Sequence, residues 1–161
     1  MTQKGLAGKN RIRFGIISFA HMHAASYARA LSEIPGAELI GIYDDNANRG
    51  LSAAAMHNTD YYDSLSDLLD ADIHAVIVCS ENIKHRDEVI QAAKAGKHIL
   101  CEKPIATTSE DAIAMIEECE REGVILATAF PVRHAPPVLR TKELIDSGAI
   151  GRVIAVCATN H

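Results

Sequence analysis

The chain has 161 residues, of which 48% are hydrophobic, so it is long enough for one domain with a buried core. Its 16 basic and 21 acidic residues give a net charge of −5, which excludes a nucleic-acid-binding surface of the usual basic kind. No stretch of about 18 apolar residues is present and the opening MTQKGLAGKNRIR has no apolar run, so we expect neither a membrane span nor a secretory signal.

The cysteines are far apart in the sequence and form no CxxC pair, which disfavours a disulfide framework or a structural zinc site. They are Cys79, Cys101, Cys119 and Cys157. We interpret all of them as reduced core thiols of a cytoplasmic protein.

Short apolar runs bounded by turn residues alternate with longer stretches of helical period, which predicts a parallel sheet with crossover helices. The expected strands are 12–17, 37–43, 61–62, 75–79, 98–101 and 125–129. The expected helices are one that ends at Pro35-Gly36, then 46–56, 65–69, 83–95 and 110–122. The predicted fold class is therefore α/β, a doubly wound, Rossmann-like parallel sheet in a three-layer sandwich.

Residues 131–137 break this alternation, and a helix at 138–147 and a strand at 153–158 are expected after the break. We therefore expect one domain over residues 1–130. Residues 131–161 are interpreted as a linker, a helix and the first strand of a second, truncated domain.

The first expected strand leads into a helix through the turn SFAHMH, residues 18–23, which contains no glycine. Glycines at such a turn normally let the phosphates of a dinucleotide approach the backbone. Ser18 and Ala20 stand at the first two glycine positions and are small enough for that approach if the turn needs no positive φ. We expect Ser18, Ala20, His21 and Met22 to line the phosphates, and the bulky His23 to tilt out or to displace the start of the helix.

Asp44 ends the second expected strand and lies 21 residues after His23. An acid at this position accepts hydrogen bonds from an adenosine ribose and repels a 2′-phosphate, which favours NAD over NADP. Asp44-Asp45-Asn46 is equally typical of a turn and helix cap, and the sequence leaves both interpretations open.

Polar residues also follow the strands expected at 75–79 and 98–101, and the carboxyl ends of parallel strands are where ligands bind. They are Ser80, Asn82 and His85 after the first strand and Glu102 and Lys103 after the second. Lys103 is the candidate catalytic residue, because an ammonium there stabilises alkoxide character on a substrate oxygen. The alternative is a solvated lysine paired with Glu102; the following Pro104, which is able to hold a cis bond, favours the catalytic interpretation.

His21 and His23 raise the question of a metal site. Such a site needs three or four converging ligands, and neither His134 nor His161 completes a set at helical or hairpin spacing, so we predict none. A Cys-His nucleophile pair is also disfavoured, because the cysteines are expected within or at the ends of apolar strands.

The segment AGKHILCEKPIATT, residues 95–108, resembles the GKHVLCEKP signature of the glucose-fructose oxidoreductase and inositol dehydrogenase family, Gfo/Idh/MocA. SENIKH, residues 80–85, is similar to the family's Thr-Pro-x-x-x-His segment. LIDSGAIGRV, residues 144–153, resembles the passage that leads into the family's second domain. The resemblance covers residues 12–158.

The resemblance implies an NAD(P)-dependent oxidoreductase that transfers hydride between nicotinamide and a sugar, polyol or related hydroxylated substrate. By position, Lys103 would be the catalytic or substrate-orienting lysine and Pro104 a cis proline, and Arg133 falls near an arginine-bearing turn of the family. The residues that would contact the cofactor are Ser80, Asn82, His85 and Glu102, with Asp44 at the adenosine ribose.

The family's second domain carries the substrate pocket, so we expect the isolated chain to be inactive. The family usually associates through the sheet of that domain, so we expect the full-length protein to form a homo-oligomer. One alternative is a non-catalytic dinucleotide sensor or regulator, and another is a structural or interaction domain without a nucleotide. Lys103 favours the enzyme, because a sensor has no use for a lysine beside the nicotinamide. The expected partner is a small hydroxylated molecule, not a nucleic acid or a membrane.

Overall fold

The computed structural model describes residues 11–159. Most of the opening segment considered for a secretory signal, and His161 among the histidines considered as ligands, lie outside the described residues. Contacts along the chain divide it into two compact units, Met1–Ala129 and Phe130–His161.

The first unit is built on a six-stranded sheet in which every neighbouring pair is parallel. Its strands are β1 (Ile12–Ile17), β2 (Ala37–Tyr43), β3 (Asp60–Tyr62), β4 (Ala75–Val78), β5 (His98–Glu102) and β6 (Leu126–Ala129). The order across the sheet is β3-β2-β1-β4-β5-β6. Successive strands are added on one side of β1 up to β3 and on its other side from β4 onward, so the strand order reverses between β1 and β4. This order confirms the predicted doubly wound α/β fold.

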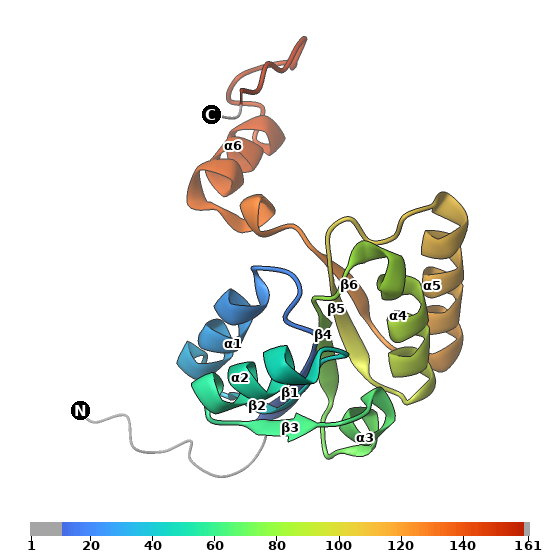
Figure 1. The fold of residues 1–161 in the computed structure, drawn as a ribbon. Coiled ribbons are helices and arrows are strands. Elements are labelled where there is room, and N and C mark those ends of the chain that lie inside the picture. Colours follow the sequence, from blue (N-terminus) through green and yellow to red (C-terminus); the bar gives the residue numbers. More distant parts are fainter. Residues whose placement is uncertain (1–10, 160–161) are drawn as a thin grey trace, which may run out of the picture. The chain divides into compact units, whose positions relative to one another are not determined.

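Helices cover both faces of the sheet (Figure 1). One face carries α1 (Ala24–Glu33) and α2 (Ala47–His57), and the other carries α3 (Leu65–Asp70), α4 (His85–Lys94) and α5 (Ser109–Glu122). A short 3₁₀ turn, η1 (Asn82–Lys84), precedes α4 where the sequence predicts the start of the helix itself. The three layers are therefore confirmed, and the predicted helices lie close to their observed bounds.

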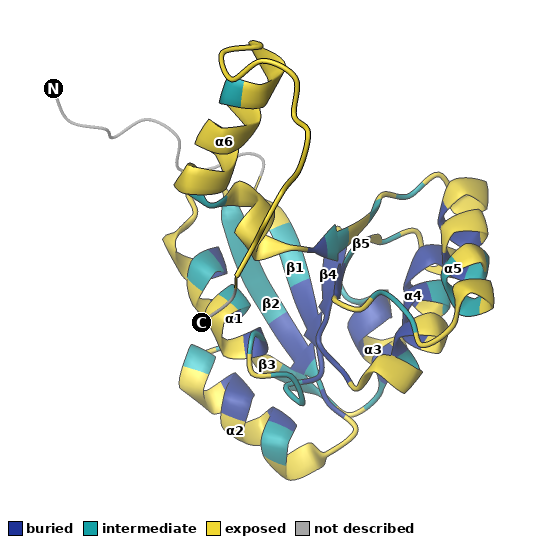
Figure 2. Ribbon diagram, turned by 90° about the horizontal axis from the view of Figure 1, so that it is seen from above, coloured by how far each residue is buried: buried dark blue, intermediate teal, exposed yellow. Residues whose placement is uncertain are grey.

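Alternate strand residues supply the two cores. Ile16 and Ile77 pack with α1 and α2, whereas Ile17 and Val78 pack with the helices on the opposite face. Successive side chains of a strand point to opposite faces, so a strand covered on both faces is apolar throughout. Figure 2 shows the buried residues along the central strands and on the helix sides that face them.

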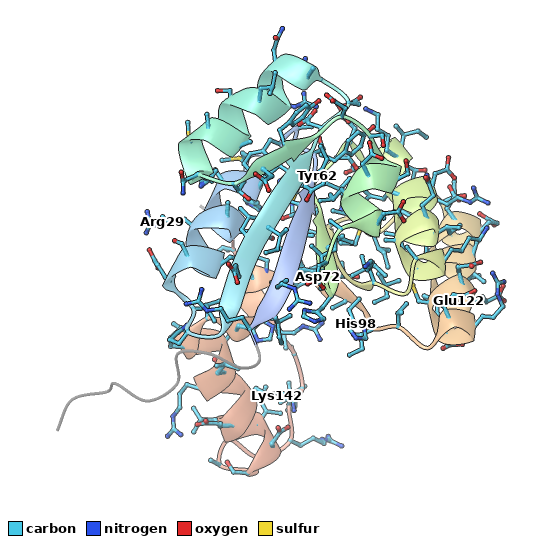
Figure 3. All side chains as sticks on the ribbon, turned by 90° about the horizontal axis from the view of Figure 1, so that it is seen from below. Arg29, Tyr62, Asp72, His98, Glu122 and Lys142 are labelled. Atoms are coloured by element: carbon cyan, nitrogen blue, oxygen red, sulfur yellow. The ribbon has the colours of Figure 1, made fainter. Side chains whose placement is uncertain are left out.

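Polar side chains also gather where the strands begin. Arg13 on β1 forms an ion pair with Asp72, and its backbone N–H donates to His74 Nδ1 at 3.0 Å. His98, the first residue of β5, accepts from the N–H of Ile125 at 3.1 Å. Figure 3 views the molecule from below, with Asp72 and His98 labelled. The bonds at this edge join neighbouring strands and their loops, so we assign them a structural role.

The second unit contains a 3₁₀ turn, η2 (Pro131–His134), and one helix, α6 (Pro136–Asp146). The helix confirms the predicted one, although it begins earlier, at a proline that suits the first helical turn. The strand predicted at 153–158 is wrong, because these residues lie in no helix or strand. A β-strand needs a partner for its hydrogen bonds, and the described part of this unit contains no other strand.

Because the strand predicted at residues 153–158 does not form, Cys157 is exposed and is not the core thiol that the sequence predicted. The other three cysteines are free and buried, as predicted for core thiols. Within residues 11–159, no helix combines the length and the apolar character needed to span a bilayer.

The close approach of β2 to a tyrosine of β3 can be tested at Gly41. An added Cβ there would lie 2.2 Å from Tyr62 Cε2, so the ring must shift to admit it. We expect Gly41→Ala to lower the free energy of unfolding by about 1–3 kcal/mol, measured by urea denaturation. In a Tyr62→Leu background the same substitution should cost less than half as much, and equal losses in both backgrounds would contradict this packing.

Candidate functional site

The carboxyl ends of four strands bring the candidate site residues to one edge of the sheet. Ile17 pairs with both Tyr43 and Val78, and Val78 pairs with Cys101, so these strand ends are level with one another. The next residues along the chain are Ser18, Asp44, Cys79 and Glu102. This edge, at the reversal of strand order between β1 and β4, is where open α/β sheets bind ligands.

Ser18 gives the glycine-free turn a backbone conformation that glycine normally supplies. Its φ is 67°, so the turn does need a positive φ, contrary to the condition set from the sequence. This conformation costs an L-residue roughly 1–2 kcal/mol. The Ser18 hydroxyl accepts the N–H of Ala20 at 3.1 Å, a bond that glycine could not make and that holds the turn closed.

The next three amides of the turn already have partners within the protein. The N–H of Phe19 donates to Asp44 Oδ2 at 2.7 Å, that of Ala20 to the Ser18 hydroxyl, and that of His21 to the Cys79 carbonyl at 2.9 Å. The turn is therefore tied to the ends of β2 and β4. Met22, at its tip, is 83% exposed.

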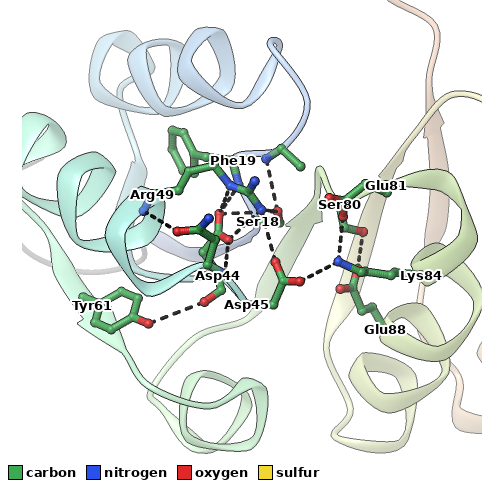
Figure 4. Close-up of polar contacts among 12 residues, drawn as sticks. Ser18, Phe19, Asp44, Asp45, Arg49, Tyr61, Ser80, Glu81, Lys84 and Glu88 are labelled. Carbon is green, nitrogen blue, oxygen red and sulfur yellow. Dashed lines mark hydrogen bonds and ion pairs between the residues drawn. The ribbon is translucent and has the colours of Figure 1, made fainter.

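Asp44 is the buried anchor of this region (Figure 4). Arg49 donates to both of its oxygens at 2.8 Å, and the N–H groups of Phe19 and Asn46 donate at 2.7 and 2.8 Å. Burial disfavours the charged carboxylate, but these donors outweigh that cost and hold the pKa of Asp44 below its ordinary value. Gly50 lets α2 approach, because an added Cβ would lie 2.9 Å from Asp44 Cβ.

The helix-cap interpretation of this stretch is confirmed at Asn46, whose side chain accepts the N–H of Arg49 at 3.1 Å and caps α2. The contact of Asp44 with a ribose stays a prediction. In the structure its carboxylate faces protein donors, and its side chain has no exposed surface.

A second set of charges lies outside Asp44 and is open to solvent. Asp45 pairs with Arg49 at 3.1 Å and with Lys84 at 2.6 Å, and Lys84 also pairs with Glu81 at 2.8 Å. Helical spacing could have suggested the Asp45–Arg49 and Glu81–Lys84 pairs. The contact between Asp45 and Lys84 joins the loops after β2 and β4, 39 residues apart, and no local sequence signal predicts it.

Two of the predicted cofactor-lining residues turn inward. The buried Ser80 hydroxyl donates to Glu88, and the ring of His85 is fully buried. The His85 ring nitrogens lie 3.1 Å from the carbonyl oxygen of Pro104 and 3.2 Å from that of Ser80. His85 thus links the loop after β4 to the loop after β5 and is a positioning residue. Asn82 remains exposed, at the start of η1.

Lys103 is exposed at the end of β5, and its bond to Pro104 is cis, as the resemblance implies. The alternative expected a solvated Lys103 paired with Glu102, and of this the structure shows the solvent exposure but not the pairing. Among the ion pairs of residues 11–159, none joins these two side chains; only the backbone N–H of Lys103 donates to Glu102, at 3.0 Å. The ammonium is therefore not held by its neighbouring carboxylate.

The carboxylate of Glu102 is 1% exposed and faces α1 instead. It accepts from the Tyr27 hydroxyl and lies 2.8 Å from His23 Nδ1. Burial disfavours its charge, but the bonds from Tyr27 and His23 and from the Lys103 amide outweigh burial and hold the pKa of Glu102 below its ordinary value. Of the two options predicted for His23, tilting out is wrong, because this carboxylate engages its ring, and a displaced helix start stays a prediction.

The structure places a third potential metal ligand, Glu102, beside His21 and His23, which the spacing of residues along the sequence did not reveal. One ligand atom each from His21, His23 and Glu102 lie within 4.8 Å of one another. Glu102 is 79 residues from His23 in the sequence, so only the pairing of the strands reveals the cluster. The prediction of no metal site rested on the absence of such a third group.

Comparison with known proteins gives a consistent result. Residues 12–130 match the model of an oxidoreductase family with an NAD-binding Rossmann fold. Levoglucosan dehydrogenase of Pseudarthrobacter phenanthrenivorans is 38% identical over 117 residues, 70% of this chain and 30% of that protein. Glucose-6-phosphate 3-dehydrogenase of Bacillus subtilis is 33% identical over 144 residues, 89% of this chain and 41% of that protein.

Among solved structures, the WlbA dehydrogenase of Bordetella pertussis in complex with NADH and UDP-GlcNAcA superposes with a TM-score of 0.83 at 30% identity. The match covers 89% of this chain and 44% of that one. The chain thus spans less than half the length of each of these three proteins.

The buried Glu88 generates a prediction about stability. Burial raises the pKa of this carboxyl from 4.5 to about 7, against the opposing effects of Ser80 and Lys84. The folded state therefore holds a proton that the unfolded state releases above pH 4.5, and stability falls as the pH rises from there through 7. In Glu88→Gln this loss should disappear, so the variant should gain about 2–3 kcal/mol relative to wild type between pH 5 and pH 8.

Urea denaturation across that pH range measures the effect, and Glu117→Gln, at an exposed carboxylate of α5, is the matched control. Parallel stability curves for wild type and Glu88→Gln would contradict the assignment.

Proposed function

Because this chain belongs to the Gfo/Idh/MocA family of oxidoreductases with an NAD-binding Rossmann fold, we propose that residues 1–130 are the dinucleotide-binding domain of an NAD-dependent dehydrogenase. The observation that carries this proposal is Lys103, an exposed lysine without an acidic partner among the described residues, at the strand edge where such sheets bind ligands. Residues 131–161 would lead into a second domain that completes the substrate site.

The turn after β1 is compatible with a dinucleotide. Ser18 supports the positive φ of a glycine turn, and the short side chain of Ala20 leaves the backbone accessible. The amides of residues 19–21 are engaged by the protein, so we assign the phosphate contacts to the N-terminal turn of α1 and to the His21 side chain, which is 26% exposed. Met22 would pack against the cofactor.

The proposed reaction is hydride transfer between nicotinamide and a hydroxylated carbon of a sugar, polyol or related compound. NAD, when bound, would supply the hydride acceptor. The Lys103 ammonium would donate a hydrogen bond to the substrate oxygen and stabilise the negative charge that develops there, while a base of the second domain would take up the hydroxyl proton. His85 positions this lysine, because its ring holds the Pro104 carbonyl.

One observation favours a second candidate, a non-catalytic dinucleotide-binding sensor or regulator. Three amides of the phosphate turn donate within the protein, which leaves fewer of them for a pyrophosphate than a glycine-rich turn offers. A regulator needs no group at the nicotinamide, however, so the function of Lys103 separates the two candidates.

We also propose a cytoplasmic location and a homo-oligomeric full-length protein. Three free, buried cysteines suit a reducing compartment. The second domain, by resemblance to the family, would supply the oligomer contacts.

The adenosine end of the cofactor would meet the charges outside Asp44. Three carboxylates, from Asp44, Asp45 and Glu81, face two cations, from Arg49 and Lys84. The excess negative charge disfavours a 2′-phosphate, and so we propose NAD as the preferred cofactor.

Asp45 offers the sharpest test of this preference, because it is exposed and holds both cations. Asp45→Asn should remove one of the three carboxylates and leave Arg49 paired only with Asp44 and Lys84 paired only with Glu81, which favours a 2′-phosphate. It should lower the NADH-to-NADPH affinity ratio by about tenfold, equivalent to about 1.4 kcal/mol. Calorimetric titration of the chain with each cofactor measures the ratio, and Asp60→Asn, an exposed acid of β3, is the control. An unchanged ratio would show that the ribose lies elsewhere.

Lys103→Met tests catalysis separately from binding. We expect NADH affinity of the chain to change by less than about threefold, whereas kcat of the active, full-length enzyme should fall by roughly 10²–10³, as for the loss of one oxyanion donor. Lys97→Met, which removes a lysine bound to the carbonyls of Ala71 and Ile73, is the matched control for charge. NADH binding with full turnover in Lys103→Met would support the regulator instead.

A further inference from the structure

Glu102 presents an electrostatic problem that the dinucleotide site does not explain. Its carboxylate is 1% exposed and accepts from the Tyr27 hydroxyl and the Lys103 amide. Within residues 11–159 its ion-pair partners are only the histidines at 21 and 23, with no lysine or arginine among them. Buried charges in proteins are normally paired with a cation or bound to a metal.

The two histidine rings converge on the same oxygen of this carboxylate. Glu102 Oε1 lies 2.8 Å from His23 Nδ1 and 3.9 Å from His21 Nδ1. The rings stand edge to face, with centroids 4.5 Å apart. Donor atoms that share a tetrahedral metal at about 2.0–2.2 Å are themselves about 3.3–3.6 Å apart, and the two distances to Glu102 Oε1 bracket this range.

We propose that His21, His23 and Glu102 form a binding site for a divalent transition metal of the Zn²⁺ class, at the edge where β1 and β5 end. Two imidazoles and one carboxylate are a donor set that such ions prefer. The metal would lie between His23 Nδ1 and Glu102 Oε1, and His21 Nδ1, which accepts the N–H of His23 at 3.3 Å, would give up that bond to complete the set. Calcium and magnesium are disfavoured, because both require mainly oxygen ligands.

Neighbouring groups already orient the ligands. Tyr27, one turn into α1, donates its hydroxyl to Glu102 Oε1, and the Lys103 amide donates to Oε2. Such secondary bonds hold a carboxylate in position for a metal. The histidine side chains are 26% and 33% exposed, so an ion can enter from solvent and can keep open positions for an oxygen ligand.

This inference goes beyond the proposed dehydrogenase function. His21 belongs to both sites, because a phosphate contact is assigned to its side chain, whereas Asp45 and Lys103 belong to the dinucleotide site alone. Titration of Zn²⁺ in the absence of a dinucleotide therefore tests the metal site by itself, and titration of NADH into the metal-stripped chain tests the dinucleotide site.

The test is calorimetric titration of ZnCl₂ into the metal-stripped chain, without an affinity tag, together with the visible absorption of the Co²⁺ form. We expect one ion per chain and a Co²⁺ spectrum typical of nitrogen and oxygen ligands in a four- or five-coordinate site. His21→Asn and His23→Asn should each weaken Zn²⁺ binding by at least about 100-fold, with circular dichroism confirming the fold. His134→Asn, an exposed histidine of η2, should bind as wild type does.

Tyr27→Phe keeps all three ligands and removes only a bond to Glu102, so it should retain one-to-one binding with an affinity reduced by about tenfold. This variant keeps the test decisive if a ligand substitution fails to fold. Absence of stoichiometric Zn²⁺ binding by the wild-type chain would overturn the proposal, as would equal affinity in wild type, His21→Asn and His23→Asn.

Discussion

A parallel sheet covered by helices on both faces leaves its polar side chains only one kind of place, the ends of the strands. Ile16 and Ile17 are both buried, and so are Ile77 and Val78, and the two members of each pair lie on opposite faces of their strand. Chemistry is therefore confined to the first residues beyond each strand. The starting edge of the sheet is tied by Arg13 and its partners, so the carboxyl edge, where the strand order reverses, carries the functional groups.

Two buried carboxylates organise that edge, and the protein treats them differently. Asp44 receives a guanidinium and two backbone amides, a set of donors that satisfies both of its oxygens. Glu102 receives a tyrosine hydroxyl, an imidazole and one amide, with no permanent cation among them. Asp44 thus fixes the turn after β1 against β2, whereas Glu102 holds the start of α1 through the side chains of His23 and Tyr27.

The amino-acid pattern predicts most of the fold because burial on both faces leaves a direct signature in each strand. Residues 12–17 and 37–43 are expected and observed as strands with the same bounds. Residues 153–158 carry a similar apolar signature but form no strand, since pairing depends on a partner outside the segment. Apolar composition therefore indicates which segments are suited to be strands, and the neighbouring strand decides whether one forms.

The candidate site is less predictable, because its side chains meet across distant loops. Position along the chain identifies Ser80 and His85 as polar groups at a strand end, but not that both turn inward, toward Glu88 and the Pro104 carbonyl. The link from His23 to Glu102 likewise spans 79 residues. Spacing rules describe neighbours on one helix or hairpin, and neither contact is of that kind.

The turn SFAHMH shows how a glycine turn is built without glycine. Ser18 accepts the strained φ, and its hydroxyl and the Asp44 carboxylate bond the next two amides in return. Those bonds stabilise the turn but withdraw the same amides from an anion. The side chains of His21 and His23, farther along the turn, are therefore groups left to recognise a ligand here, and both lie close to the buried Glu102 carboxylate. In the proposed complexes, recognition at this edge would rest on these side chains and on the first turn of α1, because the amides of residues 19–21 are already bonded within the protein.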